Sequence, residues 1–221
     1  MGKRIGLVLA GVVLGVALTA AGVVVLRHDG GSGHSRPVGP TKPAALSAEG
    51  REAIDLMQRG LDATYHARYQ SAIADPRAQG TVMTMDVWRK GTLTRQELAV
   101  QAQSVKTRSD TFQLPPNTVH CTQVADRPWS CEPPAETKPS DAPEVTIRAE
   151  LARGSIKARD DTIGGVPVRC FTFPAGGELT ETCLMGDGVA ARLVTPSSRF
   201  ELAAFTSDVP DDAFVVPAPA Q

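Results

Sequence analysis

Short segments of alternating apolar and polar residues constrain the fold of this chain more than any other feature. They recur about every ten residues after residue 64, and a period of two is typical of β-strands with one buried face. Turn residues separate them, and Asp187-Gly188 is a two-residue hairpin signal. Closely spaced strands joined by tight turns pair antiparallel. The predicted strands cover residues 64–73, 81–90, 93–100, 104–114, 155–163, 168–173, 179–185, 189–195 and 199–206.

Two helices are expected beside these strands. Residues 47–63 carry apolar side chains at helical spacing, and Ser47 is a suitable N-cap. A second, short helix over residues 142–153 follows a proline-rich loop at residues 133–143, with Gly154 just past its end. Helices beside an antiparallel sheet indicate an α+β fold in which they cover one face of the sheet.

The first 26 residues predict a membrane anchor with a short cytoplasmic N-terminus. Residues 5–26 are uncharged, and a helix of this length is about 33 Å long, enough to span a bilayer. Lys3 and Arg4 precede the run, which places the rest of the chain outside the cytoplasm. A signal peptide cleaved near Thr19-Ala20-Ala21 is the alternative, but the apolar run is longer than such a peptide needs.

The chain after this anchor divides into a tether, a domain and a tail. Residues 27–46 are rich in Gly, Pro and Ser, which is typical of a flexible tether. Residues 47–217 form the predicted extracytoplasmic domain, and residues 218–221 are a tail. The net charge is −1, with the excess of acidic residues in the domain, which argues against a nucleic-acid partner. We expect a single-pass protein of the cell membrane.

Four cysteines lie on the predicted outer side, where disulfides are stable. Three pairings are possible, and neighbours are favoured because each pair brackets a turn. We therefore predict the bridges Cys121–Cys131 and Cys170–Cys183. Zinc binding is disfavoured because the cysteines stand farther apart than the usual ligand spacing.

Motifs for catalysis are missing from the sequence. It contains no HExxH, Walker or dinucleotide-binding motif. His66 and His120 have no identifiable partner, so structural roles are favoured for both. The pairs Asp160-Asp161 and Asp211-Asp212 lack the flanking ligands of a calcium site. We expect no enzymatic activity, no metal and no cofactor.

Several segments carry a family resemblance in their order along the chain: ATYHARYQS, VWRKGTLTRQE, DTIGGVPVRCFTF, CLMGDGVAARLV and VPDDAFVVP. In this respect residues 47–217 resemble the LolA/RseB-like superfamily of bacterial envelope proteins, which includes LppX/LprG-like carriers. The resemblance implies a curved antiparallel half-barrel, closed by helices around an apolar cavity that takes acyl chains. The chain differs from the lipidated carriers because no cysteine precedes Cys121, and from the periplasmic carriers in its expected anchor.

The faces of two predicted strands supply a candidate ligand cavity. Met83, Met85 and Val87 share one face of the first strand, and Phe200 and Leu202 share one face of the second. Methionine-rich surfaces adapt to flexible apolar ligands. Ordinary core packing is the alternative, and a register error of one residue exchanges these positions for their neighbours.

Together these features predict a membrane-anchored extracytoplasmic binding protein. Its ligand in this interpretation is a lipid or a lipidated protein held in the apolar cavity. The alternative is a non-enzymatic envelope sensor or regulatory module of the RseB kind, which binds a partner protein.

Overall fold

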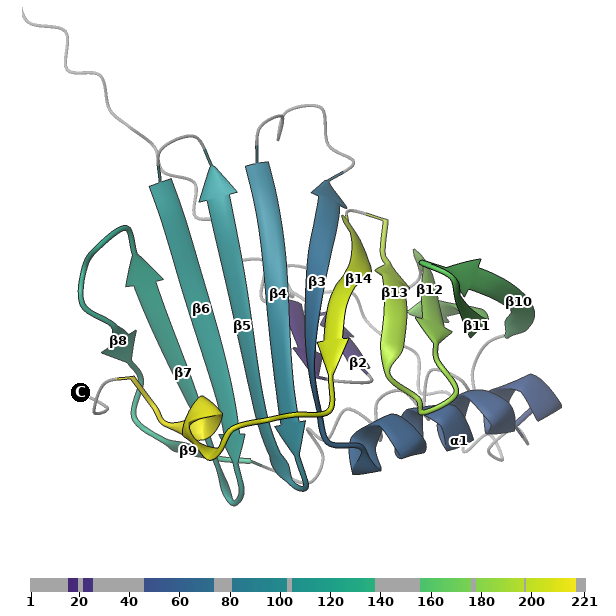
Figure 1. Cartoon of the computed structure of the whole chain (residues 1–221), viewed down its shortest axis with the longest axis horizontal. Coiled ribbons are helices and arrows are strands. Elements are labelled where there is room, and N and C mark those ends of the chain that lie inside the picture. The colour runs from purple at the N-terminus through teal and green to yellow at the C-terminus, as the bar shows by residue number, and fades with distance from the viewer. Residues whose placement is uncertain are drawn as a thin grey trace, which may run out of the picture.

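A computed structural model describes residues 46–73, 81–102, 105–137, 156–175, 178–196 and 198–217, together with the short strands β1 (Val16–Thr19) and β2 (Gly22–Val25). Its main feature is a 12-stranded antiparallel sheet (Figure 1). The strands are β3 (Tyr65–Ile73), β4 (Thr81–Lys90), β5 (Leu93–Ala102), β6 (Val105–Leu114), β7 (Asn117–Val124), β8 (Ser130–Cys131), β9 (Ala135–Glu136), β10 (Lys157–Ile163), β11 (Val166–Ala175), β12 (Glu178–Leu184), β13 (Ala190–Val194) and β14 (Ser198–Thr206).

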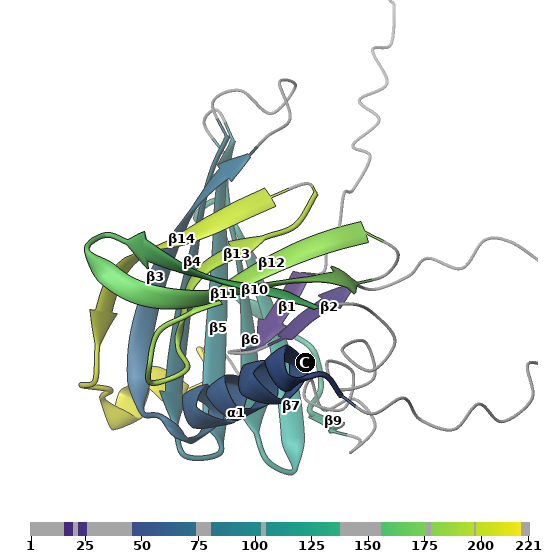
Figure 2. The same ribbon diagram turned by 90° about the vertical axis from the view of Figure 1, so that its right-hand side faces the viewer.

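The sheet grows in two directions from its centre. Its order is β10-β11-β12-β13-β14-β3-β4-β5-β6-β7-β8, with β9 paired to β7. The last strand, β14, therefore pairs with β3, the first strand of the sheet. Figure 2 shows β10–β13 running across the direction of β3–β7, so the sheet is strongly bent and resembles a half-barrel. The antiparallel sheet and the opening helix predicted from the sequence are confirmed.

Helix α1 (Ala48–Asp62) lies on the inner side of this bend (Figure 2). It begins at Ser47, whose side-chain oxygen accepts a hydrogen bond from the backbone N–H of Gly50 at 3.0 Å, the expected N-cap. Its buried residues include Ala53, Leu56 and Met57, which join the main apolar core of the sheet. We call the face of the sheet toward α1 the concave face and the opposite one the outer face.

Two disulfides connect residues that stand directly opposite each other on paired strands. Cys121 of β7 is bonded to Cys131 of β8, and Cys170 of β11 to Cys183 of β12. This is the neighbour pairing that the sequence favours. Because disulfides persist in oxidising compartments, they favour an extracytoplasmic location for the domain.

The predicted membrane helix is not seen in the described part of the N-terminal region. Strands β1 and β2 form a separate two-stranded sheet. The rest of the predicted anchor, the tether up to residue 45, the predicted helix over residues 142–153 and the tail lie outside the described residues. Among the residues that are described, no helix is both long and apolar enough to cross a bilayer.

Candidate functional site

Two rows of side chains cross the concave face from β14 to β7. Strand register places the members of each row directly opposite one another on successive strands. The first row consists of Phe200, Ser71, Met83, Val100, Thr107 and Val124. The second row consists of Leu202, Tyr69, Met85, Leu98, Ser109 and Thr122. We call these the concave rows.

Burial falls along the concave rows toward β7. Phe200 is 2% exposed and Met85 1%, whereas Val124 at the end of the first row is 45% exposed. Met83, Leu98 and Leu202 are partly buried and pack against the edge of the core. The rows therefore pass from a closed core beside β14 to a more exposed surface beside β7, where Val124 is apolar and its neighbours Thr107, Ser109 and Thr122 carry hydroxyl groups.

The concave face of β5, β6 and β7 carries no Lys, Arg, Asp or Glu in its described positions. The charged residues of these strands all point to the outer face: Arg95, Glu97, Lys106, Arg108 and Asp110. Hydroxyl and amide side chains take most of the remaining concave positions, together with His120, which is hydrogen-bonded to Thr111 at 3.1 Å. This half of the concave face is therefore neutral, and partly apolar.

The five residues predicted for the ligand cavity all lie on the concave face. Met85, Val87 and Phe200 are buried in the core, while Met83 and Leu202 stand at its margin. The described residues also place Leu98, Val100 and Val124 on this face, which the sequence analysis missed. Leu98 and Val100 alternate within the predicted strand 93–100, so alternation was a sufficient signal for them, whereas Val124 lies on β7, which the sequence analysis did not predict. Whether these residues enclose a cavity stays a prediction.

The outer face carries a chain of ion pairs across β3 to β6. Asp86 accepts from His66 at 2.7 Å and from Arg68 at 2.9 Å, which gives His66 the partner that sequence alone could not identify. The ring of His66 also stacks on Trp88, with ring centroids 4.6 Å apart. The structural role favoured for His66 from the sequence rested on the lack of a partner, and it stays a prediction.

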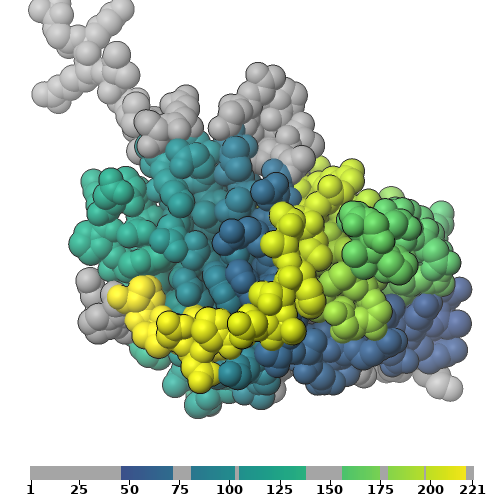
Figure 3. Space-filling model, in the orientation of Figure 1, coloured from purple at the N-terminus to yellow at the C-terminus, as the bar shows by residue number. Residues whose placement is uncertain are grey.

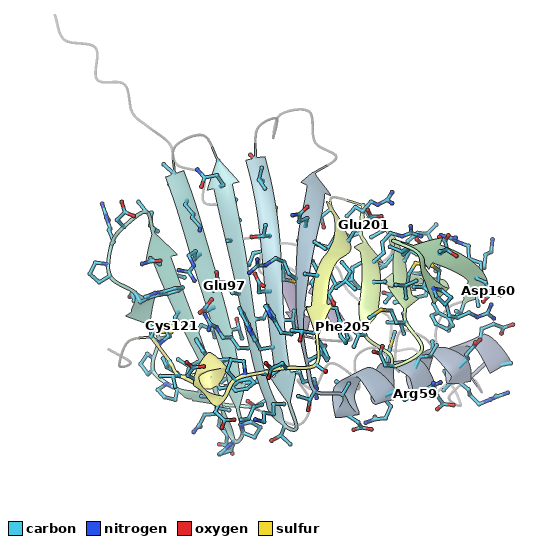
Figure 4. All side chains as sticks on the ribbon, viewed as in Figure 1. Arg59, Glu97, Cys121, Asp160, Glu201 and Phe205 are labelled. Atoms are coloured by element: carbon cyan, nitrogen blue, oxygen red, sulfur yellow. A yellow bond between two sulfur atoms is a disulfide. The ribbon has the colours of Figure 1, made fainter. Side chains whose placement is uncertain are left out.

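Arg95 is the centre of the buried part of this network. Its guanidinium donates to Asp110 at 2.7 Å and to Glu97, which is labelled in Figure 4, at 3.1 Å. The guanidinium also lies 4.5 Å from the ring centre of Trp88. Asp110 is fully buried, and its second carboxylate oxygen has no hydrogen-bond partner. Burial raises the pKa of Asp110 to about 6, although Arg95 beside it acts in the opposite direction.

The C-terminal segment covers this network. After β14 the chain crosses the outer face near its lower edge, as the yellow band in Figure 3 shows, and forms the short 3₁₀ helix η3 (Asp211–Phe214). Val209, Ala213 and Phe214 are buried against Trp88, Leu93 and Leu114. Arg95 also donates to the carbonyl oxygen of Ala213 at 3.2 Å. Arg95 therefore connects the sheet to this segment.

The raised pKa of Asp110 makes part of the stability pH-dependent. Between the ordinary carboxyl pKa of 3.8 and about 6, the folded protein holds a proton that the unfolded chain has released. This contribution therefore favours the folded state at pH 4 and is lost as the pH rises toward 7.

Asp110→Asn, which resembles the protonated acid, should thus gain stability relative to the natural protein between pH 4 and pH 7, by about 3 kcal/mol. Urea unfolding of both proteins across this range measures the difference. Carboxylates with lowered pKa elsewhere in the structure, such as Asp161 and Asp211, contribute equally to the stability of both proteins, so their contributions cancel in the difference. A difference that stays constant with pH would contradict the assignment.

One group of potential metal ligands lies within the described residues. It consists of Cys170, Glu181 and Cys183. The two sulfurs are bonded to each other, so they are not available as thiolate ligands in this structure. Arg192 instead donates to Glu181 and approaches the sulfur of Cys183 at 3.4 Å. The group is part of an ion-pair cluster over the disulfide.

Comparison with known proteins gives likenesses of fold at low sequence identity. No protein-family model matches the sequence, and no curated protein gives a significant match. An uncharacterized conserved protein from Thermus thermophilus has a TM-score of 0.49 and 9% identity, over 75% of this chain and 91% of that one. MucB in complex with MucA(peri) has a TM-score of 0.44 and 13% identity, over 74% of this chain and 59% of that one. PNGF-II has a TM-score of 0.41 and 12% identity over 72% of this chain, which spans only 31% of the PNGF-II chain.

Proposed function

We propose that this chain is a non-enzymatic, membrane-anchored extracytoplasmic binding protein whose concave face receives an apolar chain of a lipid or a lipidated protein. The observation that carries the proposal is the separation of charge between the two faces of β5–β7. All their charged side chains point to the outer face, and the concave face is neutral.

A hydrocarbon chain suits this surface because it needs no charged contact. Each methylene group buried on the concave rows contributes about 0.8 kcal/mol. The ligand would enter beside β7, where Val124 is exposed, and extend toward the half-buried Met83 and Leu98. Unbranched methionine side chains adjust to chains of different shape. A charged peptide finds no complementary group on the concave face of these strands.

Two adjacent residues of β5 provide a matched test. Leu98 belongs to the concave rows, whereas Ala99 is opposite Arg108 on the outer face, and both are half-buried. The full chain in membrane vesicles is incubated with a photoreactive fatty acid and irradiated. Leu98→Asn should lower covalent labelling by about fivefold, the effect of roughly 1 kcal/mol of lost apolar contact. Ala99→Asn should leave labelling unchanged.

Equal thermal melting curves for the two variants would show that lost labelling is not lost folding. The proposal fails if the natural protein is not labelled, or if both variants lose label to the same extent. In that case the protein-partner alternative takes its place, and crosslinking in envelope membranes becomes the next experiment.

A further inference from the structure

Strand β10 is a long open edge of the sheet, at its right-hand end in Figure 1. Among the described strands it pairs with β11 alone, over all seven of its residues. At the other end of the sheet β8 and β9 have only two residues each. An edge strand directs a row of backbone N–H and C=O groups away from its sheet, and these groups can pair with a further strand. Within the described residues, β10 is therefore the edge best suited to backbone pairing with a partner.

The charged side chains of β10 are largely paired within the chain. Such side chains often keep an edge strand from pairing, because they repel or must be desolvated. On the outer face Arg159 donates to Asp161 at 2.7 Å and to Glu181 at 2.9 Å. On the concave face Asp160 accepts from Arg169 at 3.1 Å. Three of the four charged residues of β10 thus have a partner of opposite sign, so unpaired charge does not close this edge.

The order of charges along β10 is complementary to itself in the antiparallel direction. Two identical antiparallel strands related by a two-fold axis place one residue opposite its own copy. Asp160 is the middle residue of β10, so an axis at Asp160 pairs every residue of both strands. Arg159 of each copy then stands opposite Asp161 of the other copy, which gives two crossed pairs of opposite charge on the outer face. Opposite charges at directly facing positions stabilise strand pairing.

This axis also brings the two Asp160 residues together on the concave face. Each of them is paired with Arg169 of its own chain, so the row across the axis reads arginine, aspartate, aspartate, arginine. The two flanking guanidinium groups reduce the repulsion between the carboxylates. An axis at Arg159 or at Asp161 also sets like charges opposite each other and pairs fewer residues. The register centred on Asp160 is therefore the most favourable one for two copies.

We propose that two copies of this chain associate through β10 and join their sheets into one continuous antiparallel sheet, with the two-fold axis at Asp160. Backbone hydrogen bonds along the edge hold the copies together, and the crossed pairs of Arg159 and Asp161 fix the register. The concave rows lie on other strands, from β14 to β7, so this association does not depend on the proposed ligand.

Cysteine substitutions on the concave side of β10 test this register. All four natural cysteines are bonded in pairs, so an introduced cysteine is the only free thiol of the chain. Full-length Asp160→Cys in membrane vesicles should become mostly a disulfide-linked dimer under mild oxidation. The introduced residues are directly opposite each other in the proposed dimer, as Cys170 and Cys183 are in the natural sheet.

Thr162→Cys is the matched control. Thr162 is exposed, as Asp160 is, and it lies on the same side of β10 two residues away. It faces Ala158 of the other copy, so Thr162→Cys should remain mostly monomeric on a non-reducing gel. Ala158→Cys alone should also remain monomeric, whereas the double variant Ala158→Cys with Thr162→Cys should form the linked dimer. Peptide mapping identifies the bonded residues, and melting curves equal to that of the natural protein show that each variant is folded.

Three outcomes would each overturn the proposal. They are a monomeric Asp160→Cys, equal crosslinking of Asp160→Cys and Thr162→Cys, and a double variant that links no better than its single members. Equal crosslinking would show chance collision in the membrane rather than a defined register. The fatty-acid labelling of the concave face is a separate measurement, and its result leaves this one unaffected.

Discussion

Gly188→Ala should destabilise the protein by about 4 kcal/mol, because the helix and the sheet meet at this residue without room for a side chain. A Cβ atom at Gly188 would lie 1.9 Å from the carbonyl oxygen of Leu56 and 2.4 Å from the backbone nitrogen of Gly60. Both neighbours are backbone atoms of α1, so the whole helix must move away. Overpacking costs about 1–3 kcal/mol or more, and the positive φ of +84° adds about 1 kcal/mol for alanine.

Gly165→Ala is the matched control for this effect. Gly165 has nearly the same backbone conformation, with φ of +82°, but nothing lies within 4 Å of its ideal Cβ position. It should lose only about 1 kcal/mol, the conformational cost alone. Urea unfolding of the two variants measures the difference. Similar losses in both would mean that α1 does not pack on the β12–β13 turn as closely as described.

Gly188 also shows where sequence analysis is sufficient and where it is not. Asp187-Gly188 predicts a turn from two residues, because a hairpin needs a positive φ there. Its contact with α1 joins segments more than a hundred residues apart, and no local pattern encodes that distance. The strands and the disulfides were predictable for the same reason as the turn, because each can be recognised within one short segment of sequence. The strands show alternation, and each pair of cysteines brackets a turn.

Some features of the candidate site were likewise predictable from local sequence, and others were not. Alternation placed Met83, Met85 and Val87 on one face of β4, and the structure agrees. The neutrality of the concave face depends on the relative register of β4 to β7, which separate segments of sequence cannot fix. The covering of Trp88 by the C-terminal segment was not predictable either, because η3 is too short to show a helical period.

Arg95→Ala should destabilise the protein by about 3–5 kcal/mol at pH 7, through an uncompensated buried charge. Arg95 is the partner of Asp110, which is fully buried and already has one carboxylate oxygen without a hydrogen bond. Breaking a buried pair by removing one member carries a cost of this size. The substitution also removes the hydrogen bond to Ala213 and the contact with Trp88, so the C-terminal segment should loosen.

Two further variants separate charge from lost packing. Arg95→Ala combined with Asp110→Asn should recover much of the loss at pH 7, because the double variant has no carboxylate to bury. Arg159→Ala also breaks two ion pairs, with Asp161 and Glu181, but its side chain is half-exposed and should lose less than about 1 kcal/mol. If the double variant is no more stable than Arg95→Ala, the cost comes from packing on Trp88 rather than from Asp110. A recovery larger than the stability that Asp110→Asn gains by itself indicates a buried, unpaired charge in Arg95→Ala.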